Sequence, residues 1–249
     1  MTTTPTARSH QESAMTPEHA LVSVRGLTVR YGPRTALDGL DLDLPAGRII
    51  GLLGENGCGK STLLKTLAGV YADYRGEVRV GGHPPGPESK AIVSYLPDRS
   101  GLPDQVRVRY CLDLFADFFA DFDVDKARDM IASFGLDESM RLKEMSKGMR
   151  EKVQVSLTMA RRAQVFLLDE PISGVDPAAR EGILDGILGN LEPGSLLLVA
   201  THLVHDLETT LDSVVMMRHG RVVLTGEVDD LRAEHGASLD QIFRKVYSS

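Results

Sequence analysis

The chemistry of this sequence is concentrated in a glycine-rich stretch, GLLGENGCGKSTLLKTLAG, that spans residues 51–69. Four of its first nine residues are glycines, and a lysine and two hydroxyl side chains follow directly. Glycine is the costliest residue to order, so such a cluster marks a backbone that bends sharply or approaches a ligand closely. The run from Gly54 to Ser61 matches the pattern G-x-x-x-x-G-K-[ST], which is typical of a loop that binds nucleotide phosphates.

In such a loop, successive backbone N–H groups turn toward one anion, and the following helix presents its positive end to the same phosphates. We expect Lys60 to reach the β- and γ-phosphates, and the Ser61 hydroxyl to ligate Mg²⁺. The alternative is a flexible turn, but a predicted strand before the loop and a helix after it favour a phosphate site. The predicted phosphate-binding residues are Gly54, Glu55, Asn56, Gly57, Cys58, Gly59, Lys60, Ser61 and Thr62.

Two carboxylates end an apolar run, VFLLDE, at residues 165–170. A buried strand that leads into two acids is costly unless a cation meets them at its end. We therefore expect Asp169 to hold Mg²⁺, often through water, and Glu170 to polarise an attacking water as a general base. An ordinary acidic turn is the alternative, and a phosphate-binding loop in the same chain makes it less attractive.

A histidine ends a second apolar run, SLLLVATH, at residues 195–202. His202 could sense or stabilise a γ-phosphate, although a lone histidine at the end of a strand is also a common structural residue. His205 follows one helical turn later. Two histidines without further ligands are weak support for a metal site, so we place His205 on the surface.

Parallel strands are needed to bring these loops together. The apolar run RIIGLLG is typical of a central parallel strand. Residues 60–68 are typical of an amphipathic helix, which ends at Gly69. Alternating patterns at 21–31 and 37–45 predict antiparallel strands. Further strands are predicted at 76–82, 91–97, 165–170, 195–202, 214–220 and 221–226, a loop at 83–90, and helices at 177–188 and 228–247.

The pattern changes between residues 105 and 163, where helical periodicity replaces β-branched runs. A segment of about 55 residues exceeds ordinary connection lengths, so we expect a helical lobe rather than a loop. The chain of 249 residues is otherwise ordinary in composition, with 42% hydrophobic and 25% charged residues, and fits one α/β domain with an inserted lobe.

Charge, cysteines and hydropathy exclude several classes of protein. The formal net charge of −7 argues against a general nucleic-acid binder. Cys58 and Cys111 form no disulfide framework, which fits a reducing compartment. No apolar run approaches the ~20 residues of a membrane-spanning helix. Residues 1–20 contain no Leu, Ile, Val or Phe, so we expect a disordered lead-in rather than a signal peptide.

Taken in order, these motifs resemble the ATP-binding subunit of an ABC transporter over residues 21–247. The resemblance implies an α/β fold with a P-loop NTPase core, a mainly parallel sheet, an antiparallel β flank and an inserted helical subdomain. It also implies an ABC ATPase domain at residues 21–249, with the helical insertion at about 105–163, after the lead-in of residues 1–20. The glycine loop then corresponds to the Walker A motif of this family.

The resemblance assigns further residues to the site. Tyr31 matches the aromatic residue that stacks on adenine, and His202 matches the switch histidine that stabilises the γ-phosphate. The run SGVD, which ends at Asp176, looks like the D-loop between two ATP-binding subunits. The run LDQIFRKV at residues 239–246 is similar to the C-terminal helix of many export-type subunits.

The run MSKGMREK at residues 145–152 resembles the ABC signature at the start of a helix. Ser146 can cap that helix and Gly148 leaves N–H groups bare, so an anion would meet a helix N-terminus there. In the family, this anion is the γ-phosphate held by the other subunit. The resemblance therefore implies that each chain contributes half of each site and that two chains pair head to tail.

Two positions depart from the usual pattern of the family. In the signature, Lys147 and Met149 replace a glycine and a glutamine, while Ser146 and Gly148 remain. Lys147 adds a positive charge near the expected phosphate. Asp98 follows the predicted strand at 91–97 where the family usually has a glutamine that touches Mg²⁺. A carboxylate can ligate Mg²⁺, so we predict that Asp98 does so with an altered metal dependence.

The resemblance implies a Mg²⁺-dependent ATPase that energises transport through a separately encoded transmembrane permease. Its expected partners are that permease and a second ATP-binding subunit, identical or different, with no nucleic acid. The expected location is the cytoplasmic face of the cell membrane, as a peripheral subunit.

Export of a drug, antibiotic or peptide is favoured by the C-terminal helix. A soluble ABC-type ATPase of translation or DNA repair is the alternative, but such proteins usually carry two cassettes or long coiled coils. A nucleotide-dependent regulator without turnover is disfavoured by Glu170.

Overall fold

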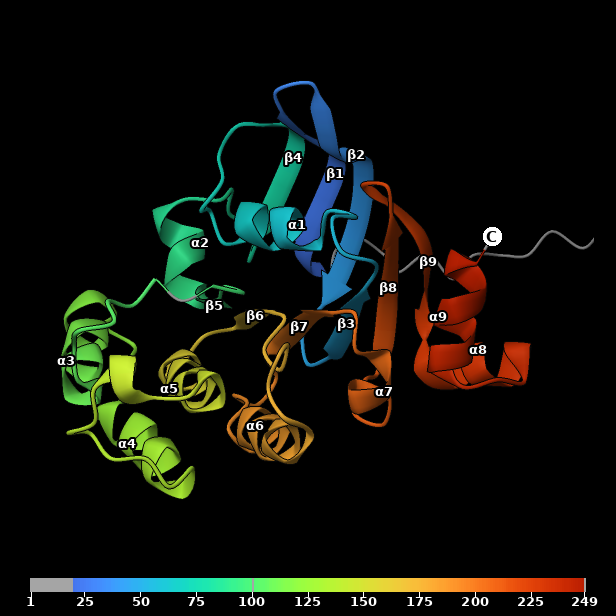
Figure 1. The fold of residues 1–249 in the computed structure, drawn as a ribbon. Coiled ribbons are helices and arrows are strands. Elements are labelled where there is room, and N and C mark those ends of the chain that lie inside the picture. Colours follow the sequence, from blue (N-terminus) through green and yellow to red (C-terminus); the bar gives the residue numbers. More distant parts are fainter. Residues whose placement is uncertain (1–19, 100, 249) are drawn as a thin grey trace, which may run out of the picture.

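The computed structural model describes residues 20–99 and 101–248, so the predicted lead-in of residues 1–20 lies, but for Ala20, outside the described residues. The described chain forms two sheets (Figure 1). The antiparallel sheet has the order β2 (Arg34–Pro45), β1 (Ala20–Tyr31) and β4 (Tyr74–Val80). The larger sheet has the order β5 (Val93–Leu96), β6 (Val165–Asp169), β7 (Leu196–Thr201), β3 (Ile49–Leu53), β8 (Ser213–Arg218) and β9 (Arg221–Glu227).

The larger sheet is parallel from β5 to β8, and β9 pairs antiparallel with β8. Its central strands are continuous apolar runs because both faces are covered: every residue of β6 and β7 is buried. The carboxyl ends of β3, β6 and β7 meet at one edge of the sheet, since these strands are neighbours in parallel register. The loops that follow the three strands therefore meet there as well.

The antiparallel sheet follows the alternating pattern of its sequence. The pairing of β1 with β2 shifts register between Val24 and Leu27, where Gly26 has a φ of 58°. This bulge keeps apolar side chains on the buried face on both sides of the glycine. The sheet covers α1 (Lys60–Leu67), and one apolar core joins the two sheets and this helix.

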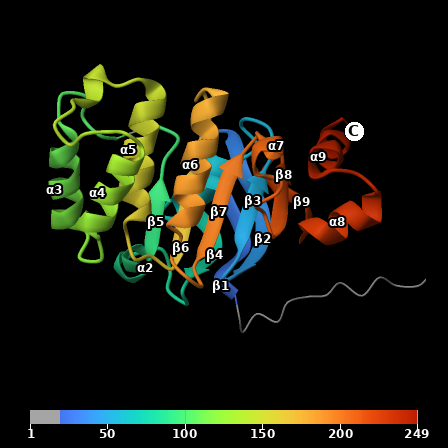
Figure 2. The same cartoon turned by 90° about the horizontal axis from the view of Figure 1, so that it is seen from below.

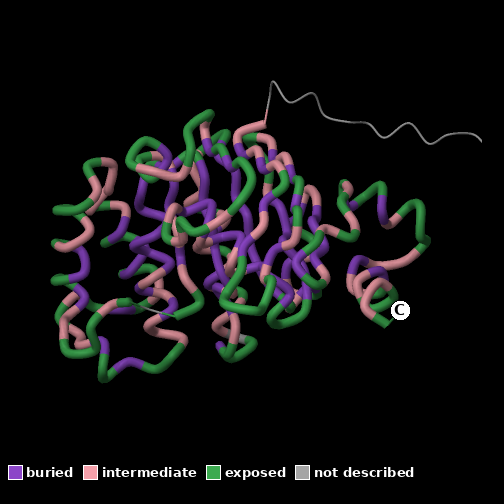
Figure 3. The backbone as a smooth tube through the Cα atoms, turned by 90° about the horizontal axis from the view of Figure 1, so that it is seen from above, coloured by how far each residue is buried: buried purple, intermediate pink, exposed green. Residues whose placement is uncertain are grey.

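A second core fills the opposite face of the larger sheet. It unites residues of β6, β7 and β8 with apolar side chains of several helices. Among these helices are α6 (Pro177–Gly189), α7 (Val204–Leu207), α8 (Val228–His235) and α9 (Leu239–Tyr247). Figure 3 shows the resulting pattern, with buried positions inside the layers and exposed positions on the connections and outer helix faces.

A third core belongs to the helices at one end of the molecule (Figure 2). They are α3 (Val108–Phe118), α4 (Val124–Ser133), the 3₁₀ helix Leu142–Glu144 and α5 (Lys147–Met159). They occupy the segment for which the sequence predicts a helical lobe. The division of residues 21–249 into a core and an inserted subdomain stays a prediction.

Two sequence predictions of local structure are wrong. The predicted loop at 83–90 and the first residues of the strand at 91–97 contain a helix, α2 (Pro87–Ile92). Pro87 opens this helix, and the Ser89 hydroxyl accepts a hydrogen bond from the Gly86 N–H, so local capping overrides the apolar pattern. The tail predicted as one helix at 228–247 is two, because Gly236 takes a left-handed conformation with a φ of 58°.

Candidate functional site

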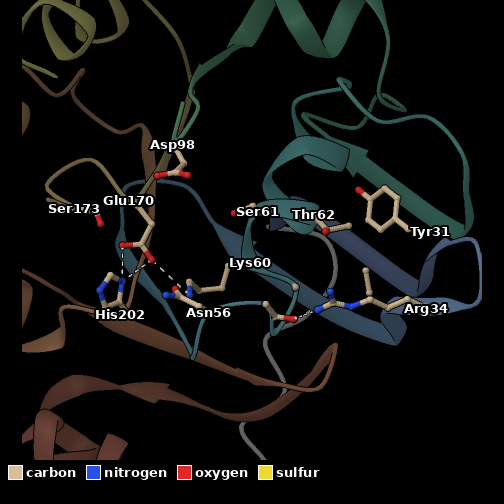
Figure 4. A pocket seen from close by; sticks show the side chains of 13 residues that line it. Tyr31, Arg34, Asn56, Lys60, Ser61, Thr62, Asp98, Glu170, Ser173 and His202 are labelled. Carbon is tan, nitrogen blue, oxygen red and sulfur yellow. Dashed lines mark hydrogen bonds and ion pairs between the residues drawn. The ribbon is translucent and has the colours of Figure 1, made fainter. Parts of the chain in front are cut away.

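A cavity of about 610 Å³ lies at the edge of the larger sheet where the loops after β3, β6 and β7 meet (Figure 4). It brings together predicted residues from across the whole sequence, between position 31 and position 202. The lining residues are Tyr31, Arg34, Ala36, Asn56, Gly57, Gly59, Lys60, Ser61, Thr62, Asp98, Glu170, Ser173 and His202. Asp169 is buried beside this cavity, where its carboxylate contacts the Ser61 hydroxyl.

The glycine loop between β3 and α1 has a backbone that only glycine adopts easily. Gly57 and Gly59 have φ angles of 81° and 116°. A Cβ atom at Gly59 would lie 2.7 Å from the Ala36 carbonyl oxygen, so no side chain fits there. Helix α1 starts at Lys60 and has no side-chain cap from the described residues, which leaves its first N–H groups available for an anion.

Lys60 is 5% exposed, and its ammonium group is satisfied by the protein itself. Its Nζ donates to the Gly54 carbonyl at 2.6 Å and lies 3.6 Å from Oε1 of Glu170. A buried ammonium needs such partners, because an unpaired buried charge is costly. A phosphate in the cavity would replace these acceptors, so the side chain must turn to reach it.

Glu170 has a φ of 53°, one of two positive values among the non-glycine residues that the structure describes. Strain of this kind is common at functional sites, where the surroundings hold a side chain in one direction. Nδ1 of His202 lies 2.9 Å from both carboxylate oxygens of Glu170, and the Thr201 hydroxyl donates to the same carboxylate at 3.3 Å. The acid and the histidine that the sequence predicted are therefore direct neighbours.

Asp169 is almost completely buried, and its carboxylate is only half satisfied. Oδ1 accepts a hydrogen bond of 3.0 Å from the Ser61 hydroxyl, whereas Oδ2 has no partner within the described chain. Burial raises the pKa of Asp169, the bond from Ser61 lowers it, and the charges of Asp98 and Glu170 raise it further. A divalent cation would relieve this cost.

Magnesium prefers hard oxygen ligands and keeps several waters. A hydroxyl in contact with a carboxylate that has a free oxygen fits this ion, so Ser61 and Asp169 are suitable ligands. Asp98 lines the same cavity, and its charge acts on Asp169. Its predicted role as a third ligand stays a prediction.

Tyr31 and Arg34 close the cavity at the end far from Glu170 (Figure 4). The Tyr31 ring is 44% exposed and packs against Tyr71, with 5.1 Å between the ring centroids. This leaves a ring face for a planar ligand. Arg34 pairs with Tyr31 across the turn between β1 and β2, and its Nη2 donates to the Gly57 carbonyl at 3.1 Å.

Sequence reasoning missed Arg34, Ala36 and Ser173 as lining residues. Arg34 could have been found, since it lies three residues after Tyr31, across a two-residue turn at Gly32 and Pro33. The proximity of Ala36 to Gly59 gave no signal in the sequence because it depends on how the antiparallel sheet packs over the loop.

Within the glycine loop, Glu55 and Cys58 have structural contacts. The Glu55 carbonyl accepts from the Cys58 N–H at 3.2 Å, and Cys58 is buried. Burial raises the pKa of the Cys58 thiol, so it is a small packing group rather than a nucleophile. The Tyr247 hydroxyl of α9 donates to the Met217 carbonyl at 2.5 Å, near Cys58 and Gly54. The C-terminal helix α9 thereby packs against the glycine loop.

Ser146, Gly148 and Asp176 are not among the lining residues of this cavity in the described chain. The Ser146 hydroxyl accepts from the Met149 N–H at 3.2 Å and caps α5, as predicted. Asp176 caps α6 by accepting from the Ala179 N–H at 3.0 Å. Both caps are exposed on the surface.

Residues 20–99 and 101–248 contain no group of three or more His, Cys, Asp or Glu side chains arranged to hold a metal. His205 is exposed, as predicted. None of the helices in these residues has the length and apolar character to cross a membrane.

The sequence matches the ABC transporter family over residues 37–173. The daunorubicin resistance ATP-binding protein DrrA3 of Streptomyces coeruleorubidus is 30% identical, over 90% of this chain and 74% of the relative. The Nod factor export ATP-binding protein I of a Rhizobium species (strain N33) is 29% identical, over 89% of this chain and 76% of the relative.

Solved structures agree with these matches. An ATP binding subunit of an ABC transporter superposes with a TM-score of 0.81 at 27% identity, over 91% of this chain and 99% of the other. A nucleotide-free ATP-binding cassette from an ABC transporter superposes with a TM-score of 0.72 at 19% identity, over 88% and 96% of the two chains. The second likeness shows the fold alone, and together the two confirm the predicted fold class.

Proposed function

Because the chain belongs to the ABC transporter family of ATP-binding proteins, we propose that it is the ATP-hydrolysing subunit of a transporter whose membrane-spanning subunit is a separate polypeptide. One observation carries this proposal: a single cavity is lined by the phosphate-binding loop, Glu170 and His202, with Asp169 buried at its side. The elements of phosphoryl transfer are therefore within reach of one triphosphate.

The chain's own residues divide the work of binding. Tyr31 stacks on adenine at one end of the cavity, and the amides of the glycine loop hold the phosphates. Lys60 leaves the Gly54 carbonyl and Glu170 to pair with the β- and γ-phosphates. When Lys60 turns to the phosphates, the Glu170 carboxylate loses this ion pair. Substrate binding therefore frees the carboxylate to act as a base.

Glu170 then orients a water molecule and takes its proton at Oε1 or Oε2. His202, already 2.9 Å from that carboxylate, holds it in place and donates to the charge that develops on the γ-phosphate. Mg²⁺ bound by Ser61 and Asp169 would neutralise phosphate charge and align the triphosphate. The strained backbone at Glu170 keeps the carboxylate aimed at the cavity in advance.

The signature and the D-loop complete a site in a second subunit. Ser146, Gly148 and Asp176 lie outside the cavity of their own chain, at exposed helix N-termini. A helix N-terminus favours an anion, and the anion that fits is the γ-phosphate held by a second ATP-binding subunit. We therefore propose a head-to-tail dimer in which ATP joins the two subunits and hydrolysis separates them.

The relatives named for daunorubicin resistance and Nod factor export support export as the direction of transport. The proposed location follows: the chain acts at the cytoplasmic face of the membrane, bound to its permease. The cargo class that we propose is a drug, antibiotic or peptide, and the permease selects among these.

The test compares the wild-type chain with Glu170→Gln, which keeps the shape of the side chain and removes its basicity. We expect Mg²⁺-dependent ATP hydrolysis by the wild type and a loss of about 100-fold or more in kcat for the variant. The variant should still bind ATP, and it should form an ATP-dependent dimer by light scattering because its ATP is not consumed. Glu192→Gln, at a residue that does not line the cavity, is the matched control and should hydrolyse normally.

Hydrolysis at the parental rate by Glu170→Gln would refute the assignment of the base. Absence of nucleotide binding by the wild type, measured by calorimetry with MgATP, would refute the function as a whole. Co-purification of a membrane polypeptide with the tagged chain from membranes is the expected result for a transporter subunit. Recovery only from the soluble fraction would instead favour an ATPase of translation or repair.

A further inference from the structure

The signature helix and the D-loop are joined inside one chain by Lys147. This residue is the first of α5, and its Nζ donates to the Ser173 carbonyl at 2.5 Å. Gly174 makes room for it: its φ is 69°, and a Cβ atom there would overlap the Lys147 ammonium group. On the same side, a Cβ atom at Gly148 would lie 3.3 Å from Val175, so the two segments are in close contact.

Ser173 also belongs to the turn that carries Glu170. Its backbone N–H donates to the Glu170 carbonyl at 3.1 Å, and its side chain lines the cavity beside Glu170 and His202. Lys147 therefore holds the carbonyl of a residue whose own N–H holds Glu170. A displacement at the start of α5 reaches the proposed base through two hydrogen bonds.

Lys147 has an acidic neighbour on its own helix and is exposed to water. Glu151 lies one turn further along α5, is buried, and attracts Lys147 electrostatically. Lys147 itself is exposed, so its bond to Ser173 is weakened by water in the isolated chain. A second subunit that covered this surface would exclude water and strengthen the bond.

We propose that Lys147 is a positioning residue that couples the two ATP sites of the dimer, by linking the signature, which serves the partner's nucleotide, to the turn that holds Glu170 in its own site. This inference rests on the proposed function. When the signature engages the partner's γ-phosphate, α5 moves at its N-terminus, and Lys147 transmits this displacement to Glu170. Occupancy of one site thereby adjusts the base of the other.

The test measures the cooperativity of ATP hydrolysis by the full-length chain, in the assembly in which it hydrolyses ATP. We expect the wild type to show a Hill coefficient for ATP well above 1, and Lys147→Met, which keeps the aliphatic stem, to show a value near 1. The kcat of this variant should fall about five- to tenfold, because the turn that positions Glu170 loses one of its hydrogen bonds. Lys147→Arg retains a donor and should restore much of the cooperativity.

Three controls separate coupling from other effects. Lys143→Met removes an exposed positive charge just upstream of the signature and should leave the Hill coefficient unchanged. Affinity of the isolated chain for a fluorescent ATP analogue should change less than twofold in Lys147→Met, because its own phosphate loop is intact. Equal melting temperatures for wild type and Lys147→Met are expected, since the side chain is exposed.

The proposed coupling is refuted if Lys147→Met keeps the wild-type Hill coefficient, or if Lys143→Met lowers the Hill coefficient by the same amount. It is also wrong if the wild type hydrolyses ATP without cooperativity. A Lys147→Met, Glu170→Gln protein that needs much more ATP to dimerise, with cooperativity retained in the single variant, would make Lys147 a phosphate ligand instead. Lack of any hydrolysis by the wild type overturns the proposed function and the coupling together.

Discussion

The two helix N-termini that we assign to ATP, those of α1 and α5, are built in opposite ways. Helix α1 has no side-chain cap among the residues described, and its anion-binding loop is surrounded by the chain's own charged groups. Helix α5 is capped by Ser146 and opens onto the surface. The first region lines a cavity of its own chain, whereas Ser146 and Gly148 of the second are not among the lining residues of that cavity in the described chain.

The difference extends to the lysines at the two sites. Lys60 is buried and paired within its own site, so only a ligand that offers equivalent acceptors can draw it away. Lys147 is exposed and bonded to a backbone carbonyl, so its position can change at little cost. Burial therefore makes the nucleotide-binding half respond to its own ligand, and exposure leaves the signature half free to respond to a second subunit.

The comparison is tested most strongly by Lys60→Ala. We expect the affinity of the isolated chain for MgATP to fall on the order of 100-fold, about 2.7 kcal/mol, because charged hydrogen bonds to phosphate are lost. Isothermal titration calorimetry measures this change. Wild-type affinity in the variant would mean that the loop amides suffice and that Lys60 serves only to pair Glu170.

Ser146→Ala tests the other region. We expect kcat for ATP hydrolysis to fall about 30-fold, near 2 kcal/mol, since a donor to the partner's phosphate is removed. Loss of the cap costs about 1 kcal/mol of stability in addition. ATP binding by the isolated chain should stay normal, which distinguishes this variant from Lys60→Ala. A parallel loss of binding would show that the signature acts within its own chain.

A third prediction concerns Glu151, a buried carboxyl group of α5. Burial raises its pKa from 4.5 to about 7, Lys147 lowers it in part, and Asp98 raises it. The folded chain thus keeps this proton to a higher pH than the unfolded chain, so the free energy of unfolding falls as pH rises from about 4.5 to about 7.

Glu151→Gln removes that titration and should raise stability on the order of 3 kcal/mol at pH 8, with little change at pH 4.5. Urea denaturation at the two pH values measures the difference. Equal gains at both values would attribute the effect to packing rather than to charge. The result would sharpen the contrast with Lys60, a buried charge that its neighbours stabilise.

The smallest effect is expected for Arg34→Ala. Arg34 lies between the Tyr31 end of the cavity and the Gly57 carbonyl. We expect about a threefold loss in ATP affinity, roughly 0.7 kcal/mol, because a partly exposed hydrogen bond that steadies the loop is lost. Arg30→Ala, in the preceding strand and not itself a lining residue, is the control. No difference between the two variants would leave Arg34 without a role in binding.

Much of the site was predictable because its parts are local in sequence. The spacing of Gly54, Gly59 and Lys60 specifies a loop by itself, and the two acids that end VFLLDE are costly to bury without a cation. Local capping also explains α2 and the break at Gly236, which the apolar pattern concealed. Of the missed lining residues, Arg34 and Ser173 each follow a predicted residue by three positions, whereas Ala36 meets Gly59 only because the antiparallel sheet packs over the loop.

The sequence by itself determined the phosphate loop, the acidic strand end and the capped signature helix, since each depends on residues within one turn or strand. Only the tertiary structure decided that Lys60 is paired with Glu170, that Asp169 has an orphaned oxygen, and that Lys147 binds the Ser173 carbonyl. The physical reason is distance along the chain. Two of these contacts join residues that lie 26 and 110 positions apart, and the orphaned oxygen depends on burial. Such contacts and such burial arise only when the strands are ordered in the sheet.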